Sequence, residues 1–182
     1  MCMKKLFDEI PVIESERLVL KRLADKDIPA LLRLTGNERV YRYLPTFLYE
    51  KQYGDMRDMI RGLYGECFAC KDSLILGIYL KDEGELCGLG EYYGFRDSLH
   101  KTCLGYRLRE EYWGRGIATE AVGAMTGYAF SQTDTEIITA STMIENTASA
   151  RVLEKNGFIR TARAVPEDWG FDEPVAADKW FR

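Results

Sequence analysis

Histidine, long apolar runs and a strong excess of charge are all scarce in this sequence of 182 residues. The one histidine, His100, lies in a predicted turn, where a solvated surface position is the default. No apolar run approaches the roughly 18 residues that a membrane helix needs. Residues 1–10 also lack the apolar core of a signal peptide. We therefore expect a cytoplasmic protein with no membrane partner.

The net charge is only −4. So mild an acidic balance argues against nucleic acid as the main partner. It does not argue against a polyanionic cofactor, because backbone N–H groups can bind phosphate without net positive charge. With 46% hydrophobic and 30% charged residues, and with no repeats or linker, the chain is predicted to form one domain over residues 1–182.

Cysteine is present in an odd number, five, spread along the chain, which suits a reducing compartment. Cys67 and Cys70 form a CxxC that, with Cys87 and Cys103, could supply four thiolates for zinc. There is no second CxxC, and Cys87 and Cys103 lie in apolar strand patterns. We therefore expect buried thiols and no metal.

Periodicity predicts a mixed α/β chain. Strands are expected over residues 14–23, 73–80, 86–95, 102–108, 136–142, 158–165 and 175–181, and helices over 25–35, 55–65, 120–131 and 146–156. Short turns between the strands of residues 73–108 imply antiparallel pairing, whereas the crossover helix 120–131 implies a parallel pair. The aromatic-rich residues 37–54 fit either core packing or a substrate-facing loop.

The junction between the strand ending at Leu108 and the helix 120–131 carries Gly114, Arg115 and Gly116. Glycine allows the backbone to approach a ligand closely, and a helix start leaves N–H groups without intrahelical partners. Together these features can bind a phosphate or pyrophosphate. Taken alone, the stretch fits a tight turn that merely starts a helix equally well.

The stretch 113–118 resembles the acetyl-CoA-binding motif of the GCN5-related N-acetyltransferase (GNAT) superfamily, (Q/R)xxGx(G/A), with Trp113 at its first position. Residues 146–158 resemble the second signature of that superfamily, in the form NxxSxRxLEKxGF. Residues 15–21 and 105–114 are similar to the branch that includes the ribosomal-protein alanine acetyltransferases (RimJ/RimL-like).

The resemblance implies an α+β fold with a twisted, mostly antiparallel sheet of about seven strands and about four helices. It also implies direct transfer of an acetyl group from acetyl-CoA to a primary amine, on a protein N-terminus or a small molecule, without a metal. The branch suggests a homodimer. The acceptor pocket is expected to involve residues 37–54 and the C-terminal hairpin with Trp169 and Trp180.

The residues expected to bind acetyl-CoA lie in three places. The pyrophosphate is expected on the first turn of the helix, the pantetheine arm along the strand that ends before it, and both signatures are expected to face one ligand. The full set is Leu108, Arg109, Gly114, Arg115, Gly116, Ile117, Ala118, Thr119, Asn146 and Ser149. A backbone N–H of that strand would polarise the thioester carbonyl.

The catalytic candidates are Ser149 and Glu91. Many family members have a tyrosine acid where this chain has Leu153, and Ser149 stands where the branch carries a serine that assists the leaving thiolate. The alternative for Ser149 is a local backbone hydrogen bond. Glu91 is expected beside the acetyl site as a base with a raised pKa, or else as a solvent-facing strand residue.

Two other classes of protein fit parts of the sequence. A dinucleotide-binding fold would use Gly114 and Gly116 with Asp134 on a ribose, but Thr119 stands in place of the third glycine. A non-catalytic acyl-CoA-binding protein on the same fold would account for the absent tyrosine.

Overall fold

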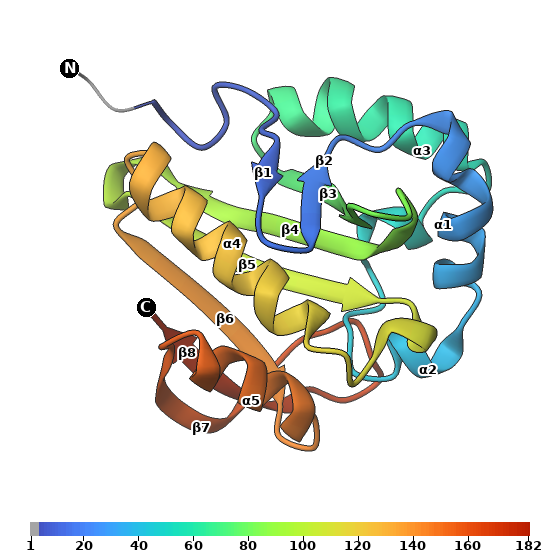
Figure 1. The fold of residues 1–182 in the computed structure, drawn as a ribbon. Helices are drawn as coiled ribbons and strands as arrows, with labels where there is room; N and C mark the ends of the chain where they lie inside the picture. The colour runs from blue at the N-terminus through green and yellow to red at the C-terminus, as the bar shows by residue number, and fades with distance from the viewer. Residues whose placement is uncertain (1–3) are drawn as a thin grey trace.

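The computed structural model describes residues 4–182, which form one eight-stranded sheet and five α-helices (Figure 1). The strands are β1 (Ile13–Glu14), β2 (Leu18–Lys21), β3 (Ser73–Leu80), β4 (Leu86–Arg96), β5 (Lys101–Leu108), β6 (Ile137–Met143), β7 (Ile159–Glu167) and β8 (Val175–Phe181). The helices are α1 (Ile28–Thr35), α2 (Glu38–Tyr41), α3 (Met56–Gly62), α4 (Ile117–Gln132) and α5 (Thr147–Lys155).

The strands lie in the order β1-β2-β3-β4-β5-β6-β8-β7. Every neighbouring pair is antiparallel except β5 and β6, which are parallel and are joined by α4. The predicted antiparallel run over residues 73–108 and the predicted parallel crossover are therefore confirmed.

The predicted strand over residues 14–23 is instead a hairpin of β1 and β2. The chain turns at Ser15, whose amide donates to the Leu18 carbonyl and whose hydroxyl oxygen accepts from the Leu18 amide at 3.2 Å. Residues 14–17 are all polar, and the predicted strand ran through them. The hairpin accounts for the eighth strand.

Most helix ends follow from capping side chains. Asn37, Asp55 and Asn146 accept hydrogen bonds at the starts of α2, α3 and α5. Asp25, the predicted first cap, opens a short 3₁₀ turn instead. Asp27 holds that turn, because its carboxylate accepts from the Ala24 amide and from the Tyr79 hydroxyl.

Two apolar cores lie on opposite faces of the sheet. Helix α4 covers one face, with Met125 and Ala129 buried against β2, β4 and β5 (Figure 1). Helices α1 and α3 cover the other face, with Leu31 and Met59 buried there. Each strand therefore directs alternate side chains to one core or the other.

The sheet opens in its middle. Strands β5 and β6 pair only through residues 101–103 and 137–139, and beyond these pairs the two strands diverge (Figure 1). The remaining halves of the two strands face each other without a ladder between them. A ligand can therefore reach free main-chain groups inside the sheet.

Candidate active site

A cavity of about 850 Å³ occupies this opening. Its walls include Leu104 and Leu108, which belong to the core beneath α4. They also include Glu91 and Tyr93, which alternate with Tyr92 of that core and so lie on the opposite face of the sheet. Two molecules can therefore approach the same point from opposite faces.

The start of α4 forms one wall. Gly114 and Gly116 have left-handed φ angles of 71° and 77°, a region that favours glycine. The amide of Glu120 donates to the carbonyl of Gly116 to begin the helix, so the amides of residues 117–119 precede the intrahelical ladder. Their N–H groups and the helix dipole favour an anion here.

The β1–β2 hairpin holds this helix start in place. Arg17 donates to the Arg115 carbonyl at 3.1 Å and pairs with Glu120 at 2.7 Å, and the Ser15 hydroxyl donates to Glu120 at 2.7 Å. Burial opposes the charge on Glu120, but the bonds from Arg17 and Ser15 hold the pKa of its carboxyl below the usual value. Residues 15–21, which resemble the GNAT superfamily, thus hold the start of α4 in place.

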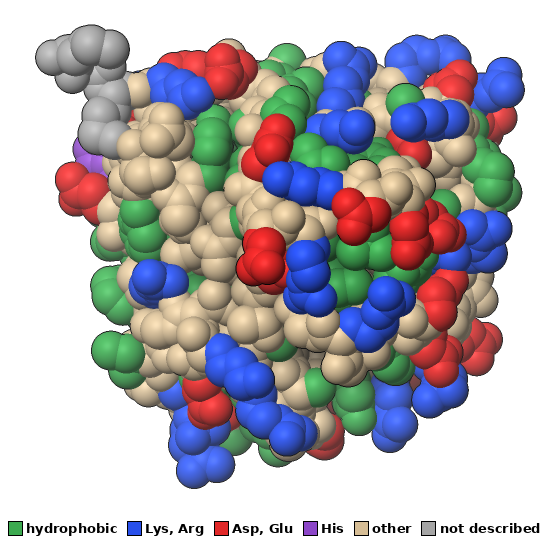
Figure 2. Space-filling model, in the orientation of Figure 1, with side chains coloured by type: hydrophobic (Ala, Val, Ile, Leu, Met, Phe, Trp, Pro, Cys, Tyr) green, Lys and Arg blue, Asp and Glu red, His purple; other side chains and the backbone are tan. Residues whose placement is uncertain are grey.

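Charged side chains on the α4 side of the molecule are mixed in sign (Figure 2). Lys and Arg lie among Asp and Glu over the face that the figure shows, and neither sign dominates it. This face offers an anion no broad basic surface, whereas the start of α4 offers main-chain donors.

The end of β5 presents backbone amides to the opening. The Arg109 amide donates to Cys87 of β4 at 2.8 Å, and the direction of amides alternates along a strand. The amides of Leu108 and Tyr106 therefore point away from β4, into the opening. Trp113 fixes this end, because its indole N–H donates to the Leu108 carbonyl at 2.9 Å.

Helix α5 forms the wall opposite β5. Asn146 caps it by accepting from the Ser149 amide at 3.2 Å, and the Ser149 Oγ accepts from the Tyr106 hydroxyl at 3.1 Å. Asn156 links α5 to α4, because its side chain donates to the Thr119 carbonyl at 3.1 Å. The two signature stretches are thus held together as one unit.

A buried ionic cluster lies on the other face of the sheet. Arg107 pairs with Glu50 and with Glu91, each at 2.5 Å. The Tyr41 hydroxyl donates to Glu50 at 2.8 Å, and the Ser73 hydroxyl donates to Glu91 at 2.5 Å. Burial disfavours the Arg107 charge, but the two carboxylates raise its pKa above the ordinary value.

Comparisons with known proteins agree with this geometry. A family model for an acetyltransferase (GNAT) domain matches residues 17–159. The Bacillus subtilis (strain 168) protein YoaA, an uncharacterized N-acetyltransferase, is 30% identical over 150 residues, which are 81% of this chain and 82% of YoaA. The chain belongs to the GNAT acetyltransferase family.

Solved structures show the same fold. A GNAT-family acetyltransferase from Bacillus anthracis has a TM-score of 0.78 at 24% identity, over 94% of this chain and 98% of that one. RimL, a ribosomal α-N-protein acetyltransferase solved with coenzyme A, also has a TM-score of 0.78, at 16% identity, over 94% of this chain and 97% of RimL. The predicted fold and the predicted enzyme class, an N-acetyltransferase, are confirmed.

Most residues expected to bind the cosubstrate of this GNAT enzyme line the cavity. They are Leu108, Gly114, Gly116, Ile117, Ala118, Thr119, Asn146 and Ser149. Arg109 and Arg115 do not line it. The Arg109 guanidinium points back to Glu85 and the Leu86 carbonyl, and the Arg115 guanidinium stacks over Tyr112. The sequence motif identifies positions in the backbone, and these two side chains point away from the cavity, Arg109 into the protein and Arg115 to the surface.

Glu91 lines the cavity but differs from the predicted half-buried base. Only 7% of it is exposed, and its two oxygens are bonded to Arg107 and Ser73. The predicted site did not include the side chains of Arg107, Glu50 and Tyr106. Arg107 stands in a strand pattern, where a buried charge would need a partner. The sequence does not show which residue this is, because Glu50 lies 57 residues away along the chain.

The two regions expected at the acceptor pocket do meet. The Thr46 amide donates to the Trp169 carbonyl at 2.9 Å, and the Thr46 hydroxyl donates to the Gly170 carbonyl at 3.0 Å. Tyr43, Phe47 and Trp169 line the cavity, so the aromatic segment is partly a pocket wall. Trp180 is instead buried in the core beneath α4, where its indole donates to Thr142.

Of the four described cysteines, Cys67 lines the cavity, and His100 does not. Cys67 and Cys87 are buried as expected, Cys103 is half-buried and Cys70 is exposed, while Cys2 lies outside the described residues. Burial raises the pKa of Cys87 to about 11. Within residues 4–182, no three His, Cys, Asp or Glu side chains are grouped to hold a metal ion.

His100 is half-buried, and its Nδ1 lies 3.2 Å from Asp134. Asp134 therefore contacts His100 in a turn. The dinucleotide-binding alternative requires Asp134 to line the cavity, and it does not. In the part of the chain that the structure covers, no helix has the length and apolarity to cross a membrane.

Proposed function

We propose that this GNAT enzyme transfers an acetyl group directly from acetyl-CoA to a primary amine, and that the two substrates meet in the opening between β5 and β6. The observation that carries the proposal is a single cavity walled by the start of α4 on one side and by β4, residues 37–54 and the β7–β8 loop on the other. Acetyl-CoA is the cosubstrate of this family, and the cavity offers it main-chain donors at the expected positions.

The pyrophosphate is assigned to the amides from Gly114 to Thr119. The pantetheine arm is assigned to the free edge of β5, where the Leu108 amide faces the opening and can donate to the thioester oxygen. Asn146 acts here by capping α5 and so placing Ser149. Arg115 would contact phosphate only if its side chain moved away from Tyr112. Arg109 instead has a structural role in the turn before α4.

The chemistry requires a group that assists the leaving thiolate and a path for the amine proton. Ser149 supplies a hydroxyl at the cavity wall and is proposed as the catalytic residue for the thiolate. Glu91 was the expected base, but Arg107 and Ser73 occupy its oxygens. We therefore assign Glu91 to holding the acceptor wall, and the amine proton to solvent in the cavity.

The acceptor is proposed to be a primary amine on a protein N-terminus or a small molecule. Proteins of this fold include RimL and a Vibrio cholerae spermidine N-acetyltransferase solved with CoA and spermine, which has a TM-score of 0.75 at 18% identity, over 92% of this chain and 96% of that one. A homodimer in the cytoplasm is also proposed, by resemblance to the ribosomal-protein branch, and light scattering of the purified chain tests the dimer.

The proposal is tested by following CoA release with acetyl-CoA and a panel of amines. The panel contains peptides with free and blocked N-termini, polyamines and amino acids. Release with some free amines and not with blocked peptides is the expected result. Tight acetyl-CoA binding without release for any amine would favour a non-catalytic acyl-CoA-binding protein, and stabilisation by NAD alone in a thermal-shift assay would contradict both.

A further inference from the structure

The hydrogen bond between Tyr106 and Ser149 crosses the opening. Tyr106 comes from β5 and Ser149 from the first turn of α5, and both line the cavity. The Tyr106 hydroxyl donates to the Ser149 Oγ at 3.1 Å. The bond lies where the free edge of β5 faces the wall that carries the proposed catalytic hydroxyl.

The other bonds of Ser149 determine where its own proton can point. Its amide is held by Asn146, and its Oγ is an acceptor for Tyr106. Helix hydroxyls elsewhere are used differently: Thr126 and Thr133 donate to carbonyls one turn back, at 2.7 and 2.6 Å. No such bond to the preceding turn is found for Ser149 within residues 4–182. Its proton is therefore available to a ligand in the cavity.

Tyr106 is a fixed donor rather than an acid. Burial raises the pKa of Tyr106 to about 12, against a small opposing effect of the Ser149 bond. An ordinary thiol has a pKa of about 8.5, so proton transfer from Tyr106 to a thiolate would be unfavourable by about three orders of magnitude. Tyr106 thus keeps its proton at neutral pH and continues to donate to Ser149.

We propose that Tyr106 is a positioning residue that holds the Ser149 hydroxyl with its proton directed at the sulfur leaving from acetyl-CoA. This inference rests on the proposed function. In the step, the amine nitrogen forms a bond to the carbonyl carbon, the C–S bond breaks with its electron pair going to sulfur, and the Ser149 hydroxyl hydrogen-bonds that sulfur. The amine loses its proton to solvent.

The replacement of the family's tyrosine is consistent with this arrangement. Leu153, at that position, is 1% exposed and belongs to the core beneath α4. Leu153 also lines the cavity, and its apolar side chain offers no hydroxyl there. In this chain a tyrosine hydroxyl reaches the same region from the sheet, and it acts on the serine.

The test is a double-mutant cycle with Tyr106→Phe and Ser149→Ala. Phenylalanine keeps the ring and removes only the donor. We expect Tyr106→Phe to lower kcat about 10-fold while the KM for acetyl-CoA stays within about twofold, because binding does not need the oriented proton. In the Ser149→Ala background the same change should have no further effect on kcat, since the two residues act through one hydroxyl.

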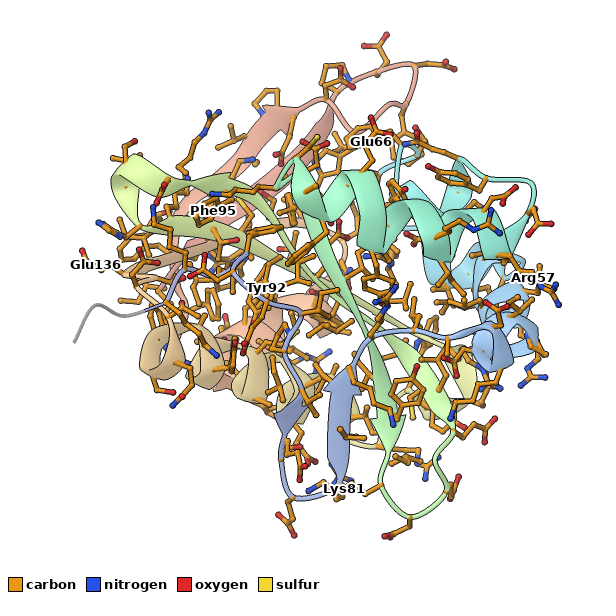
Figure 3. All side chains as sticks on the ribbon, turned by 90° about the horizontal axis from the view of Figure 1, so that it is seen from above. Arg57, Glu66, Lys81, Tyr92, Phe95 and Glu136 are labelled. Carbon is orange, nitrogen blue, oxygen red and sulfur yellow. The ribbon has the colours of Figure 1, made fainter. Side chains whose placement is uncertain are left out.

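Tyr92→Phe is the matched control. Tyr92 lies on β4 in the interior of the molecule (Figure 3), its hydroxyl donates to the Met125 carbonyl at 2.7 Å, and it does not line the cavity. This variant should lose thermal stability and keep the wild-type kcat. The comparison separates loss of a buried phenol from loss of the bond to Ser149.

Two results would overturn the inference in an active enzyme: a wild-type kcat in Tyr106→Phe, or an equal loss of kcat with and without Ser149. A rise in KM with unchanged kcat would also contradict it, since it assigns Tyr106 to binding. If the wild-type chain releases no CoA with any amine, the proposed function fails and this inference fails with it. Measuring the wild type first distinguishes the two failures.

Discussion

The two ends of the cavity are built in different ways. At the donor end, where acetyl-CoA is proposed to bind, one contiguous stretch, residues 114–119, supplies main-chain N–H groups at the start of α4. At the acceptor end, the wall rests on side chains from separate segments, with Arg107 joined to Glu50 and Glu91. Recognition of a phosphate by the backbone needs a local chain shape, whereas recognition of an amine depends on tertiary contacts.

The difference extends to charge. At the proposed donor end Arg115 stacks over Tyr112 and does not line the cavity, and the helix start provides positive potential. The acceptor end contains a buried cation that is stable only because two carboxylates surround it. The variants below act on one end or the other, and they are ordered from the largest expected effect to the smallest.

Gly116→Asp should abolish acetyl-CoA binding, weakening it by at least about 100-fold. Residue 116 has a φ of 77°, which disfavours a residue with a Cβ, and a carboxylate there would repel the phosphates. Calorimetry measures the affinity. Gly127→Asp, on the exposed side of the same helix with open space around the Cβ position, is the control and should bind normally. An unchanged affinity for acetyl-CoA in Gly116→Asp would contradict the assignment of the pyrophosphate to the start of α4.

Arg107→Met should lower the free energy of unfolding by about 3–5 kcal/mol, because it leaves two buried carboxylates without a cationic partner. Urea unfolding measures the change. The same substitution combined with Glu50→Gln and Glu91→Gln should restore a large part of the loss, since no buried charge then remains. A loss below about 1 kcal/mol in the single variant would show that the acceptor wall does not depend on this cluster.

Ser149→Ala should lower kcat by about 10- to 100-fold and change the affinity for acetyl-CoA by less than about twofold, because one oriented hydrogen bond to the leaving group is lost. Steady-state kinetics and calorimetry separate the two quantities. Thr147→Ala is the control, since Thr147 is exposed in the same turn of α5 and does not line the cavity. Unchanged turnover in Ser149→Ala would leave Ser149 with no catalytic role.

Glu120→Gln should cost about 1 kcal/mol of stability at neutral pH, by weakening the brace between the β1–β2 hairpin and α4. The folded-state pKa of Glu120 lies below its ordinary value of 4.5. Its stabilising effect is therefore fully present above pH 4.5 and is lost as the pH falls through the lower folded value.

Urea unfolding of the wild type and Glu120→Gln at neutral pH and near pH 3 checks this dependence. Glu136→Gln serves as the control, because Glu136 is exposed at the edge of the molecule (Figure 3). A difference between Glu120→Gln and the wild type that stays constant with pH would contradict an ionic role for Glu120.

Much of the fold could be predicted because its signals are local. Strands β3, β4 and β5 begin and end within a residue or so of their predicted bounds, since apolar runs and turn residues are adjacent in the sequence. The hairpin of β1 and β2 was not predicted, because β1 has only two residues and so leaves no periodic pattern in the sequence.

The candidate site divides in the same way. The motif found Gly114, Gly116 and the first turn of α4, all of which line the cavity. Arg109 and Arg115 do not line the cavity, because a motif fixes the backbone and not the direction of a long side chain. Glu91 was placed in the wall, but its pairing with Arg107 followed only from the register of β4 and β5.

The sequence by itself therefore determined the enzyme family, the order of the elements and the donor end of the cavity, because each depends on residues close together in the chain. Only the tertiary structure decided which side chains face the acceptor. Glu50 and Arg107 meet across 57 positions, and Tyr106 and Ser149 across 43. The physical reason is that a strand-to-helix turn is set by neighbouring residues, whereas these bonds join segments that only the folded chain brings together.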